Sequence, residues 1–446
     1  MKVALLTSHL GFGHTRALEA IKEKLHRLRT PVQTEVIDFW SLMDPKAADA
    51  IKSGYLALAN HFSDYYDKLY QLDEEALNDI LETDQLPPEL IQELNRLMNH
   101  WFPGVHSLKT ALTRTHNLDQ FLITAITLTH TQHHGSLARI IRLMLLTVIR
   151  GVLLHRFKRR LRAFKPDIAV STQIYGAVLS SMAKRWPWPI KLPVMSVVTD
   201  YGIHKLWVRK GVDYYCLPDE AIQPPTALSH QQAAIVTGIP LMHEFDQLLP
   251  PLIAKQLLKL DAQLITVLVT GGMYSLGTGQ ALQELVKLPC NIQIIYAGAD
   301  QETLLNNDGL GAQVLQAIQT GKIKALGWCQ SMMPVYRAAD IVIGKAGGLT
   351  ITESLACGRP FIATFCLGGQ ERFNIDYLEQ NNLGRYIQPQ QLATLLPYLN
   401  NRKKLIDWQM RCSTMANRHG THMVVREILQ INQMQEFDER IPLTVP

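Results

Sequence analysis

The chain has 446 residues, of which 47% are hydrophobic and 19% are charged, and its formal net charge is +5. This composition excludes a disordered chain, and so small a net charge over this length gives no reason to expect nucleic acid as a partner. The length exceeds that of one ordinary hydrophobic core and predicts two domains.

The six cysteines are scattered, with no Cys-x-x-Cys pair and no histidine at zinc-ligand spacing. We therefore expect no disulfide framework and no metal site, and a reducing compartment. The apolar run at the N-terminus is too short for a signal peptide, and no run reaches the ~18 uninterrupted apolar residues of a membrane-spanning helix. The sequence predicts a cytoplasmic protein without a transmembrane helix.

The first predicted elements are a strand, a glycine-containing turn and a helix. Residues 2–7 are apolar, Gly11 and Gly13 follow, and an amphipathic pattern covers about 15–29. With a second strand at 34–39, this order predicts a βαβ unit and a parallel sheet. Further strands of this half are predicted at 167–171, 193–199, 213–217 and 233–237.

The segment from about 71 to 135 interrupts this scheme. It is helical in pieces, with breaks at Pro87-Pro88 and Pro103-Gly104. We expect a helical insertion in the first domain, because proline and glycine end helices.

The second half begins the α/β pattern again. A strand at 264–270 is followed by Gly271 and Gly272. Two such halves predict an α/β fold of two Rossmann-like domains, 1–240 and 241–446, that face one cleft. The hinge is expected near 238–251, and the last helices can cross back to the first domain. Further strands of this half are predicted at 292–297, 323–326, 340–343 and 360–364.

The turn after the first strand is one candidate site. Its glycines allow a ligand to approach backbone N–H groups, and the helix N-terminus favours an anion or a polarised oxygen. It is not a dinucleotide fingerprint, because Arg16 stands where the third glycine is required. His14 can act as a base near neutral pH, or it can be a capping histidine in a tight turn.

The turn after the predicted strand at 340–343 is a second candidate. Gly347 and Gly348 can cradle a diphosphate on backbone N–H groups, and Glu353, about one and a half turns into the next helix, can accept hydrogen bonds from two ribose hydroxyls. The motif is not a Walker A loop. The alternative is a simple strand-to-helix turn with a solvated glutamate.

A third candidate follows the predicted strand at 360–364. Gln370, Glu371 and Asn374 bring amide and carboxylate groups to a strand end, which suits recognition of several sugar hydroxyls. A polar surface loop explains the same residues.

Five sequence blocks together resemble a known family. They are SHLGFGHTRAL (8–18), GYLALANHFSDYYDKLYQL (54–72), VVTDYGIHKLWVRKGVDYYCLPD (197–219), GIPLMHEF (238–245), and 327–374 with GKAGGLTITESLACGRPFI and GQERFN. In this order they resemble the GT-B glycosyltransferases of the family that contains monogalactosyldiacylglycerol synthase, the bacterial processive diacylglycerol glucosyltransferase and, more distantly, the peptidoglycan GlcNAc transferase. The resemblance covers about 2–384 and is poor over 71–135.

The resemblance implies donor-side roles. Glu353 would bind the ribose, and Lys345 would supply a positive charge that many relatives take from an arginine at the position of Met242. The diphosphate would lie on the turn formed by Gly347, Gly348, Leu349 and Thr350. Trp328 and Cys329 would flank the uracil, Gly272 and Met273 would lie near the donor, and Gln370, Glu371 and Asn374 would read its sugar.

On the acceptor side, His14 matches the histidine that is implicated in acceptor activation, within the turn that holds Gly11 and Gly13. Asp200 and His204 match a Thr-Asp-x-x-x-His block, and Tyr66 lies in the tyrosine-rich block. Family enzymes invert the anomeric carbon without requiring a bound metal, so neither metal nor cofactor is expected and one base suffices. His14 is the favoured base, and Asp200 is the alternative.

A basic amphipathic stretch covers 137–165. Arg139, Arg142 and Arg150 share one stripe of an apolar helix. Such a helix can lie on an anionic membrane surface, or it can pack on the first domain with a solvated basic end. The basic cluster that follows the stripe consists of Arg156, Lys158, Arg159, Arg160 and Arg162.

The expected function is transfer of a hexose from a UDP-sugar to a membrane lipid such as diacylglycerol, at the inner face of the cell membrane. Alternatives are a polyprenyl-linked or soluble acceptor, a nucleotide-sugar epimerase with the GT-B architecture, and a non-catalytic protein that binds a nucleotide or a partner. The presence of both His14 and Glu353 argues against the non-catalytic alternative.

Overall fold

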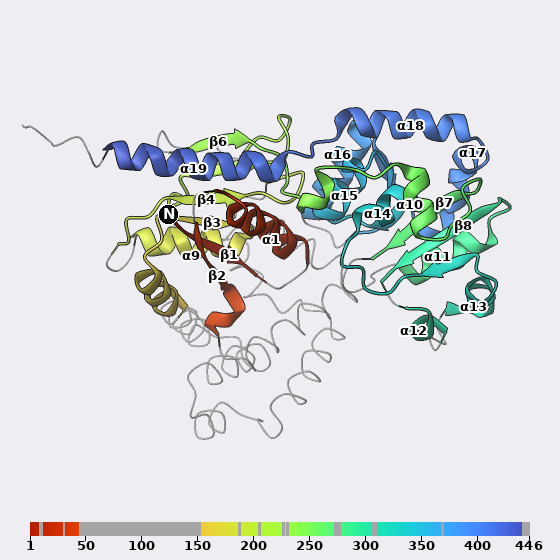
Figure 1. Ribbon diagram of the computed structural model, residues 1–446, viewed down its shortest axis with the longest axis horizontal. Coiled ribbons are helices and arrows are strands. Elements are labelled where there is room, and N and C mark those ends of the chain that lie inside the picture. The colour runs from red at the N-terminus through yellow and green to blue at the C-terminus, as the bar shows by residue number, and fades with distance from the viewer. Residues whose placement is uncertain are drawn as a thin grey trace, which may run out of the picture.

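The computed structural model describes residues 1–8, 12–29, 32–43, 153–185, 189–203, 207–224, 228, 232–271, 278–298, 300–305, 310–366 and 370–438. Within these ranges the chain forms two parallel sheets with helices on their faces (Figure 1). The predicted pair of Rossmann-like domains is confirmed.

The first sheet has the order β2-β1-β3-β4-β5-β6, and every pairing is parallel. Helix α1 (Phe12–His26), helix α9 (Ile174–Arg185), a helix at 153–164 and a short 3-10 helix, η1 (Phe39–Leu42), accompany it. The strands are β1 (Lys2–Thr7), β2 (Gln33–Asp38), β3 (Ile168–Ser171), β4 (Val194–Val197), β5 (Tyr214–Leu217) and β6 (Ala233–Val236).

The second sheet has the order β12-β11-β10-β7-β8-β9, again wholly parallel. Its strands are β7 (Ile265–Thr270), β8 (Ile292–Ala297), β9 (Ile323–Ala325), β10 (Ile341–Lys345), β11 (Phe361–Phe365) and β12 (Gly384–Tyr386). The α-helices are α10 (Pro251–Leu257), α11 (Thr278–Lys287), α12 (Gln301–Leu305), α13 (Ala312–Gln319), α14 (Met333–Ala338), α15 (Gly348–Ala356), α16 (Gln370–Gln380), α17 (Leu396–Leu399) and α18 (Arg402–Met415), with 3-10 helices η3 (His243–Phe245) and η6 (Pro389–Leu395).

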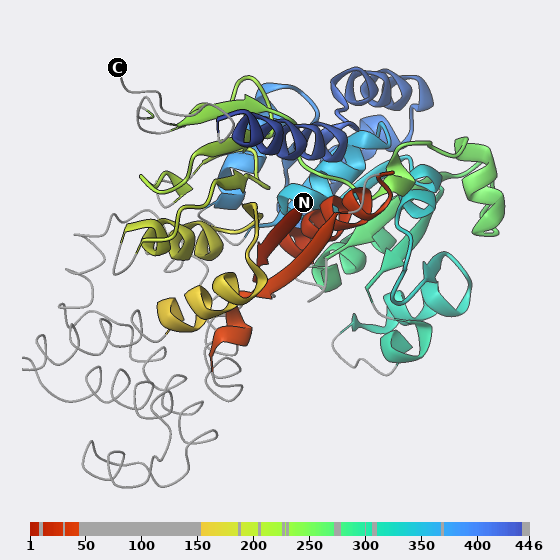
Figure 2. The same cartoon turned by 60° about the vertical axis from the view of Figure 1, so that its left-hand side comes forward.

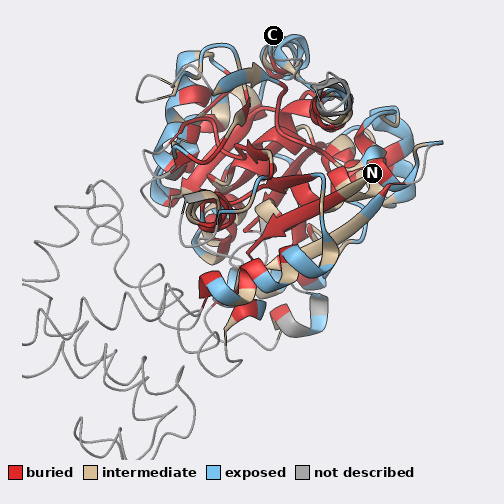
Figure 3. Ribbon diagram, turned by 90° about the vertical axis from the view of Figure 1, so that its left-hand side faces the viewer, coloured by how far each residue is buried: buried red, intermediate tan, exposed pale blue. Residues whose placement is uncertain are grey.

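The central strands are buried on both faces. Every residue of β7 and of β8 is buried, as expected for parallel strands with helices on either side. Figure 3, seen from the side of the first domain, shows buried strands inside and exposed outer sides of helices. Eleven of the strands lie where the sequence predicts them, within two residues at each end, and the fully buried ones are continuous apolar runs. The exception is β12, whose three residues carry no apolar run.

The last helix, α19 (Gly420–Asp438), packs on the first domain although the chain before it belongs to the second (Figures 1 and 2). Its apolar side contributes Val424, Val425, Ile428 and Ile431 to the core beneath β1 and α1. The first domain is therefore completed by the end of the chain.

The chain crosses between the domains twice, and the two crossings touch. The hydroxyl of Thr421 accepts from the Leu241 N–H at 2.9 Å and donates to the Leu241 carbonyl at 2.6 Å. Gly238 has a φ of 86° and lies against Asn417. The predicted hinge segment is thus bonded to the return segment.

Candidate active site

The carboxyl ends of strands from both sheets meet at the boundary between the domains. In the first sheet, β1 leads to α1 and β4 leads to residues 198–203; in the second, β10 leads to the glycine turn and α15, and β11 precedes α16. Strand order reverses between β1 and β3 and between β7 and β10. Ligands of open α/β sheets bind at such reversal points. The two reversal points lie together, because α1 contacts α15.

His14 lies in the first turn of α1. Its Nδ1 is 2.7 Å from the hydroxyl of Thr199, and its carbonyl accepts from the Thr172 hydroxyl at 2.9 Å. Burial lowers the pKa of His14, and the charge of Asp200 opposes this effect. A lowered pKa leaves the imidazole neutral and able to accept a proton near neutral pH.

Charges of the second domain also act on His14. Lys345, at the end of β10, lowers its pKa, and Glu371, in the first turn of α16, raises it. Lys345 donates a short hydrogen bond to Glu371, so the two form an ion pair beside the histidine. The base predicted in one domain therefore faces polar residues of the other.

The predicted diphosphate turn lies directly against the first domain. Gly347 precedes α15 and Gly348 begins it. A Cβ atom at Gly348 would lie 2.1 Å from the Thr199 carbonyl oxygen and 2.8 Å from Oδ1 of Asp200. Only glycine permits this approach.

Glu353 is buried, which contradicts the alternative of a solvated glutamate. It is 8% exposed, and Oε2 accepts from the Tyr336 hydroxyl at 3.0 Å. Burial raises its pKa to about 7, against the opposing effects of the Tyr336 hydrogen bond and the charge of Arg16. A buried carboxyl with so perturbed a pKa is typical of a binding site.

Asn374 joins the two domains. Its Oδ1 accepts from the Tyr201 N–H at 2.7 Å, and its Nδ2 donates to Asp200 Oδ1 at 2.8 Å and to the Ala346 carbonyl at 2.9 Å. The side chain is wholly buried.

The remaining predicted site residues lie on several elements or outside the described residues. Trp328 is 64% exposed and Cys329 is partly buried beside the second domain's core, while Leu349 and Thr350 lie in the first turn of α15. Gly13 lies close to Leu349, with 3.4 Å between a Cβ placed on the glycine and the Cβ of the leucine. Gln370 begins α16. Gly11, Tyr66, His204, Gly272 and Met273 lie outside the described residues, as does the insertion at 71–135.

Sequence reasoning missed several residues that the structure brings to this place. Thr199 and Tyr201 lie in the block 197–219 but were not predicted as site residues. Arg16 was noted only because it occupies the position of the third glycine of a dinucleotide fingerprint. Tyr336 carries no motif. A local pattern could not identify them: the partners of Thr199 and Tyr201 lie 151 to 185 residues away, Tyr336 bonds to another helix, and Arg16 acts on the pKa of Glu353 of the other domain.

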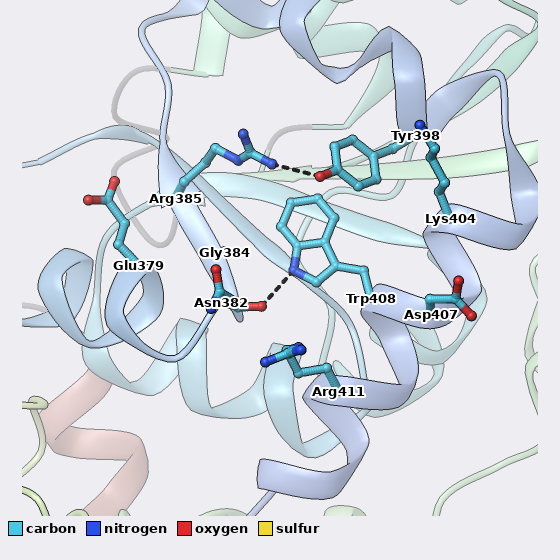
Figure 4. A pocket seen from close by; sticks show the side chains of 9 residues that line it. All are labelled: Glu379, Asn382, Gly384, Arg385, Tyr398, Lys404, Asp407, Trp408 and Arg411. Carbon is cyan, nitrogen blue, oxygen red and sulfur yellow. Dashed lines mark hydrogen bonds between the residues drawn. The ribbon is translucent and has the colours of Figure 1, made fainter.

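A separate pocket of about 680 Å³ lies between β12, α17 and α18 (Figure 4). Arg385 stacks over Tyr398 and Trp408, with 5.5 Å and 5.3 Å from its guanidinium carbon to the ring centroids, and donates to the Tyr398 hydroxyl. Trp408 donates to the Asn382 carbonyl. None of the predicted site residues lines this pocket.

The described end of the basic stretch is a packed helix. Residues 153–164 bury Leu154, Phe157 and Leu161 in the first domain's core. Arg156 donates to the Leu42 carbonyl, and Arg160 pairs with Glu35. The predicted basic cluster is thus corrected: Lys158 is buried, and only Arg159 and Arg162 of its five members are exposed. Arg139, Arg142 and Arg150 lie outside the described residues.

Among the helices that the structure describes, none is both long enough and apolar enough to cross a membrane.

Two family models match the chain. Residues 104–241 match the model of monogalactosyldiacylglycerol (MGDG) synthase, and residues 266–415 match that of the glycosyltransferase family 28 C-terminal domain. The second match covers β10, α15 and α16, where the donor-side residues are predicted.

Curated relatives with sequence similarity are processive diacylglycerol beta-glucosyltransferases. One from Bacillus pumilus is 25% identical over 54% of this chain and 63% of its own length, so the match spans less than two thirds of that relative. Another, from Bacillus subtilis, is 24% identical over 62% of this chain and 72% of its own length.

The fold of this chain is similar to that of several solved structures. MurG of Acinetobacter baumannii has a TM-score of 0.54 at 14% identity, over 96% of this chain and 99% of its own. The spinosyn rhamnosyltransferase SpnG has a TM-score of 0.51 at 13% identity, over 96% and 100%. The predicted GT-B fold is therefore confirmed.

Proposed function

We propose that this chain, which has the GT-B fold and a glycosyltransferase family 28 C-terminal domain, transfers a hexose from a UDP-sugar to diacylglycerol or a similar membrane lipid with inversion. One observation carries the proposal. The turn at Gly348 lies against Asp200 of the other domain, and Lys345 and Glu371 of the second domain act on the pKa of His14 of the first. A base and a nucleotide-type turn thus share one interface.

The donor would bind the second domain. Glu353, held by the Tyr336 hydroxyl, offers its carboxylate to the ribose, and the backbone N–H groups at the start of α15 face the diphosphate. Lys345 adds a positive charge when the diphosphate displaces Glu371 from it. Glu371 is then available to a sugar hydroxyl. Exposed Trp328 suits stacking against the uracil.

The reaction needs one displacement. The acceptor hydroxyl oxygen attacks the anomeric carbon while the bond from that carbon to the β-phosphate oxygen breaks, and its electron pair leaves with UDP. The acceptor proton passes to the neutral imidazole of His14. Backbone N–H groups and Lys345 stabilise the charge that develops on the diphosphate, so the step needs neither metal nor cofactor. Asp200 remains the alternative base.

The lipid acceptor is proposed from the sequence relatives, which are named for diacylglycerol. His155, Arg159 and Arg162 lie on one exposed face of the helix at 153–164. Two arginines on a helix face attract an anionic bilayer by about 1 kcal/mol each. We propose peripheral binding to the inner face of the cell membrane.

The test is UDP release by the full chain. UDP-glucose, UDP-galactose and UDP-N-acetylglucosamine are each incubated with vesicles that contain phosphatidylglycerol, with and without dioleoylglycerol. We expect one donor to release UDP only with dioleoylglycerol, and its sugar to appear on the lipid with the opposite anomeric configuration. Release of free sugar without an acceptor would indicate an epimerase. Transfer only to a soluble or polyprenyl-linked acceptor would exclude diacylglycerol as the acceptor. If none of the donors released UDP, the proposal that the chain is a glycosyltransferase would be refuted.

A further inference from the structure

Residues Thr199, Asp200 and Tyr201, hereafter the 199–201 segment, follow β4, and each is bonded to another part of the site. We infer that this segment is a positioning element that orients His14 only while the second domain is docked against it, and that Asn374 holds it there. The inference deepens the proposed function and rests on it.

Thr199 is bonded to the base. With the Thr199 hydroxyl 2.7 Å from Nδ1, Nε2 is the ring nitrogen that remains for a substrate. A neutral imidazole has one N–H, so Nε2 can accept a proton only if Nδ1 carries the hydrogen and donates it to Thr199. The threonine therefore leaves Nε2 as the free ring nitrogen, and its hydroxyl can accept from Nδ1–H in the tautomer that catalysis requires.

Asp200 is held by the second domain. Asn374 of α16 donates to its carboxylate at 2.8 Å and also accepts from the next backbone N–H, that of Tyr201, at 2.7 Å. The second Nδ2 hydrogen goes to the carbonyl of Ala346, the residue before the diphosphate turn. Because the amide is wholly buried and all its groups are bonded within the protein, we assign Asn374 to positioning rather than to reading the donor sugar.

Tyr201 is embedded in the second domain. Its ring stacks on Tyr377 of α16 at 4.0 Å and 12°, and its hydroxyl lies 3.1 Å from that of Thr352, the residue before Glu353. Although it belongs to the first domain's chain, it is 7% exposed and part of the second domain's hydrophobic core. Separation of the domains would expose this ring.

Two glycines, one from each domain, make the contact possible. Gly348 lies against the Thr199 carbonyl, and a Cβ at Gly202 would lie 2.3 Å from Cγ of Phe373 on α16. Neither position tolerates a side chain without movement of the 199–201 segment or of α16. Each domain therefore contributes a glycine that this close approach requires.

These contacts make the orientation of His14 depend on the docking of the second domain. With the domains apart, Asp200 and Tyr201 lose their partners in the second domain, and Thr199, next to them in the chain, is no longer held against His14. Proton abstraction is then confined to the docked state, in which the donor turn is in place. This arrangement limits attack by water on a donor bound to an open protein.

The experiment compares four variants of the full chain. Thr199→Val removes the hydroxyl at nearly constant shape, and Thr199→Ser restores it. Asn374→Ala removes the bridge. Tyr377→Phe is the matched control, because it keeps the ring on Tyr201 and removes only an inter-domain hydrogen bond to Asp219, 3.0 Å long. Each is measured with UDP-glucose, or the donor that the wild type uses, and dioleoylglycerol in vesicles.

We expect Thr199→Val and Asn374→Ala to lower kcat about 30-fold or more, with KM for the donor within about threefold, because orientation of a general base is lost while donor binding is kept. Thr199→Ser recovers most of the activity, and Tyr377→Phe stays within about threefold. The charged groups that face His14 are Asp200, Lys345 and Glu371. Asn374→Ala frees Asp200, whose charge raises the pKa of His14, so the acid limb of kcat/KM moves to higher pH.

A second readout does not depend on activity. Nitrogen-15 spectra of labelled histidines, with the His14 signal identified by its loss in His14→Ala, report the tautomer. We expect the Nδ1–H form in the wild type and in Tyr377→Phe, and a mixture in Thr199→Val and Asn374→Ala. If Asn374→Ala does not fold, Tyr201→Phe, which removes the hydroxyl contact with Thr352, tests the same link.

An unchanged tautomer and an unchanged acid limb in the Asn374 variant would overturn the inference, as would an equal loss of kcat in Tyr377→Phe. Absence of turnover in the wild type, with the expected change of tautomer, would refute the proposed reaction while leaving the positioning by Thr199 and Asn374 intact.

Discussion

Replacement of Glu353 by glutamine is expected to stabilise the folded protein at alkaline pH and to weaken donor binding. The buried carboxyl has a pKa of about 7, compared with 4.5 for an ordinary glutamate. Since the folded pKa is raised, this group contributes stability that is fully present below the unfolded pKa and is lost as pH rises from about 4.5 through about 7. A difference of about 2.5 pKa units corresponds to roughly 3 kcal/mol for a buried group. Glutamine does not ionise, so Glu353→Gln should unfold at a higher temperature than the wild type at pH 8, and the difference should shrink as the pH falls toward 4.5.

Donor binding is expected to change in the opposite direction. Hydrogen bonds from ribose hydroxyls to a carboxylate contribute about 1.5–3 kcal/mol, so UDP should bind Glu353→Gln roughly 10- to 100-fold more weakly at pH 8. Wild-type affinity should fall below pH 7 as the carboxyl is protonated, and the difference between the two proteins should narrow. Because the terminal phosphate of UDP titrates at about pH 6, the two proteins are compared at each pH.

Titration calorimetry with UDP from pH 6 to pH 8.5 and thermal unfolding followed by circular dichroism provide the two measurements. Equal UDP affinities at pH 8 would remove Glu353 from the donor site. Equal unfolding temperatures at pH 8 would show that the carboxyl is less buried than its contact with Tyr336 and its exposure of 8% indicate.

Three further predictions follow from the same interface. His14→Ala should lower turnover by about 10²- to 10⁴-fold with UDP affinity unchanged, and full activity in this variant would assign the base to Asp200. Gly202→Ala should displace Phe373 and destabilise the protein by about 1–3 kcal/mol in urea unfolding, with a parallel loss of kcat, whereas a wild-type midpoint would mean that α16 moves freely. Replacing both Arg159 and Arg162 by glutamate should weaken flotation with phosphatidylglycerol vesicles by at least about 2 kcal/mol without affecting UDP binding, and undiminished flotation would place the membrane contact elsewhere.

The fold could be predicted from the sequence because its buried strands are short apolar runs between turns. The run at 292–297 coincides with β8 residue for residue. The strand β12 was not predicted, since Gly-Arg-Tyr carries no such signal and its place is set by β11. The helix at 153–164 shows the limit of periodicity, because Phe157 and Leu161 fit a packed helix and a membrane-surface helix equally well.

The turns that form the candidate site could be predicted from the sequence, but the contacts between its residues could not. Glycines at strand ends identified His14 and Gly348, because backbone geometry restricts those positions to few residue types. The bond between Asp200 and Asn374 joins residues 174 positions apart, and no local pattern encodes it. The burial of Glu353 was equally hidden, since glutamates on helices are usually solvated.

The return of α19 to the first domain affects how the chain folds during synthesis. Until Val424, Val425 and Ile428 emerge, the face of the first sheet that they cover stays open to water. At ~5–20 residues per second, the roughly 200 residues after the first domain take about 10–40 s to translate. For that time a nearly complete Rossmann-like unit presents uncovered apolar side chains on the ribosome, which makes the nascent chain a candidate for chaperone binding. A fragment that ends near residue 240 would remain permanently in that state.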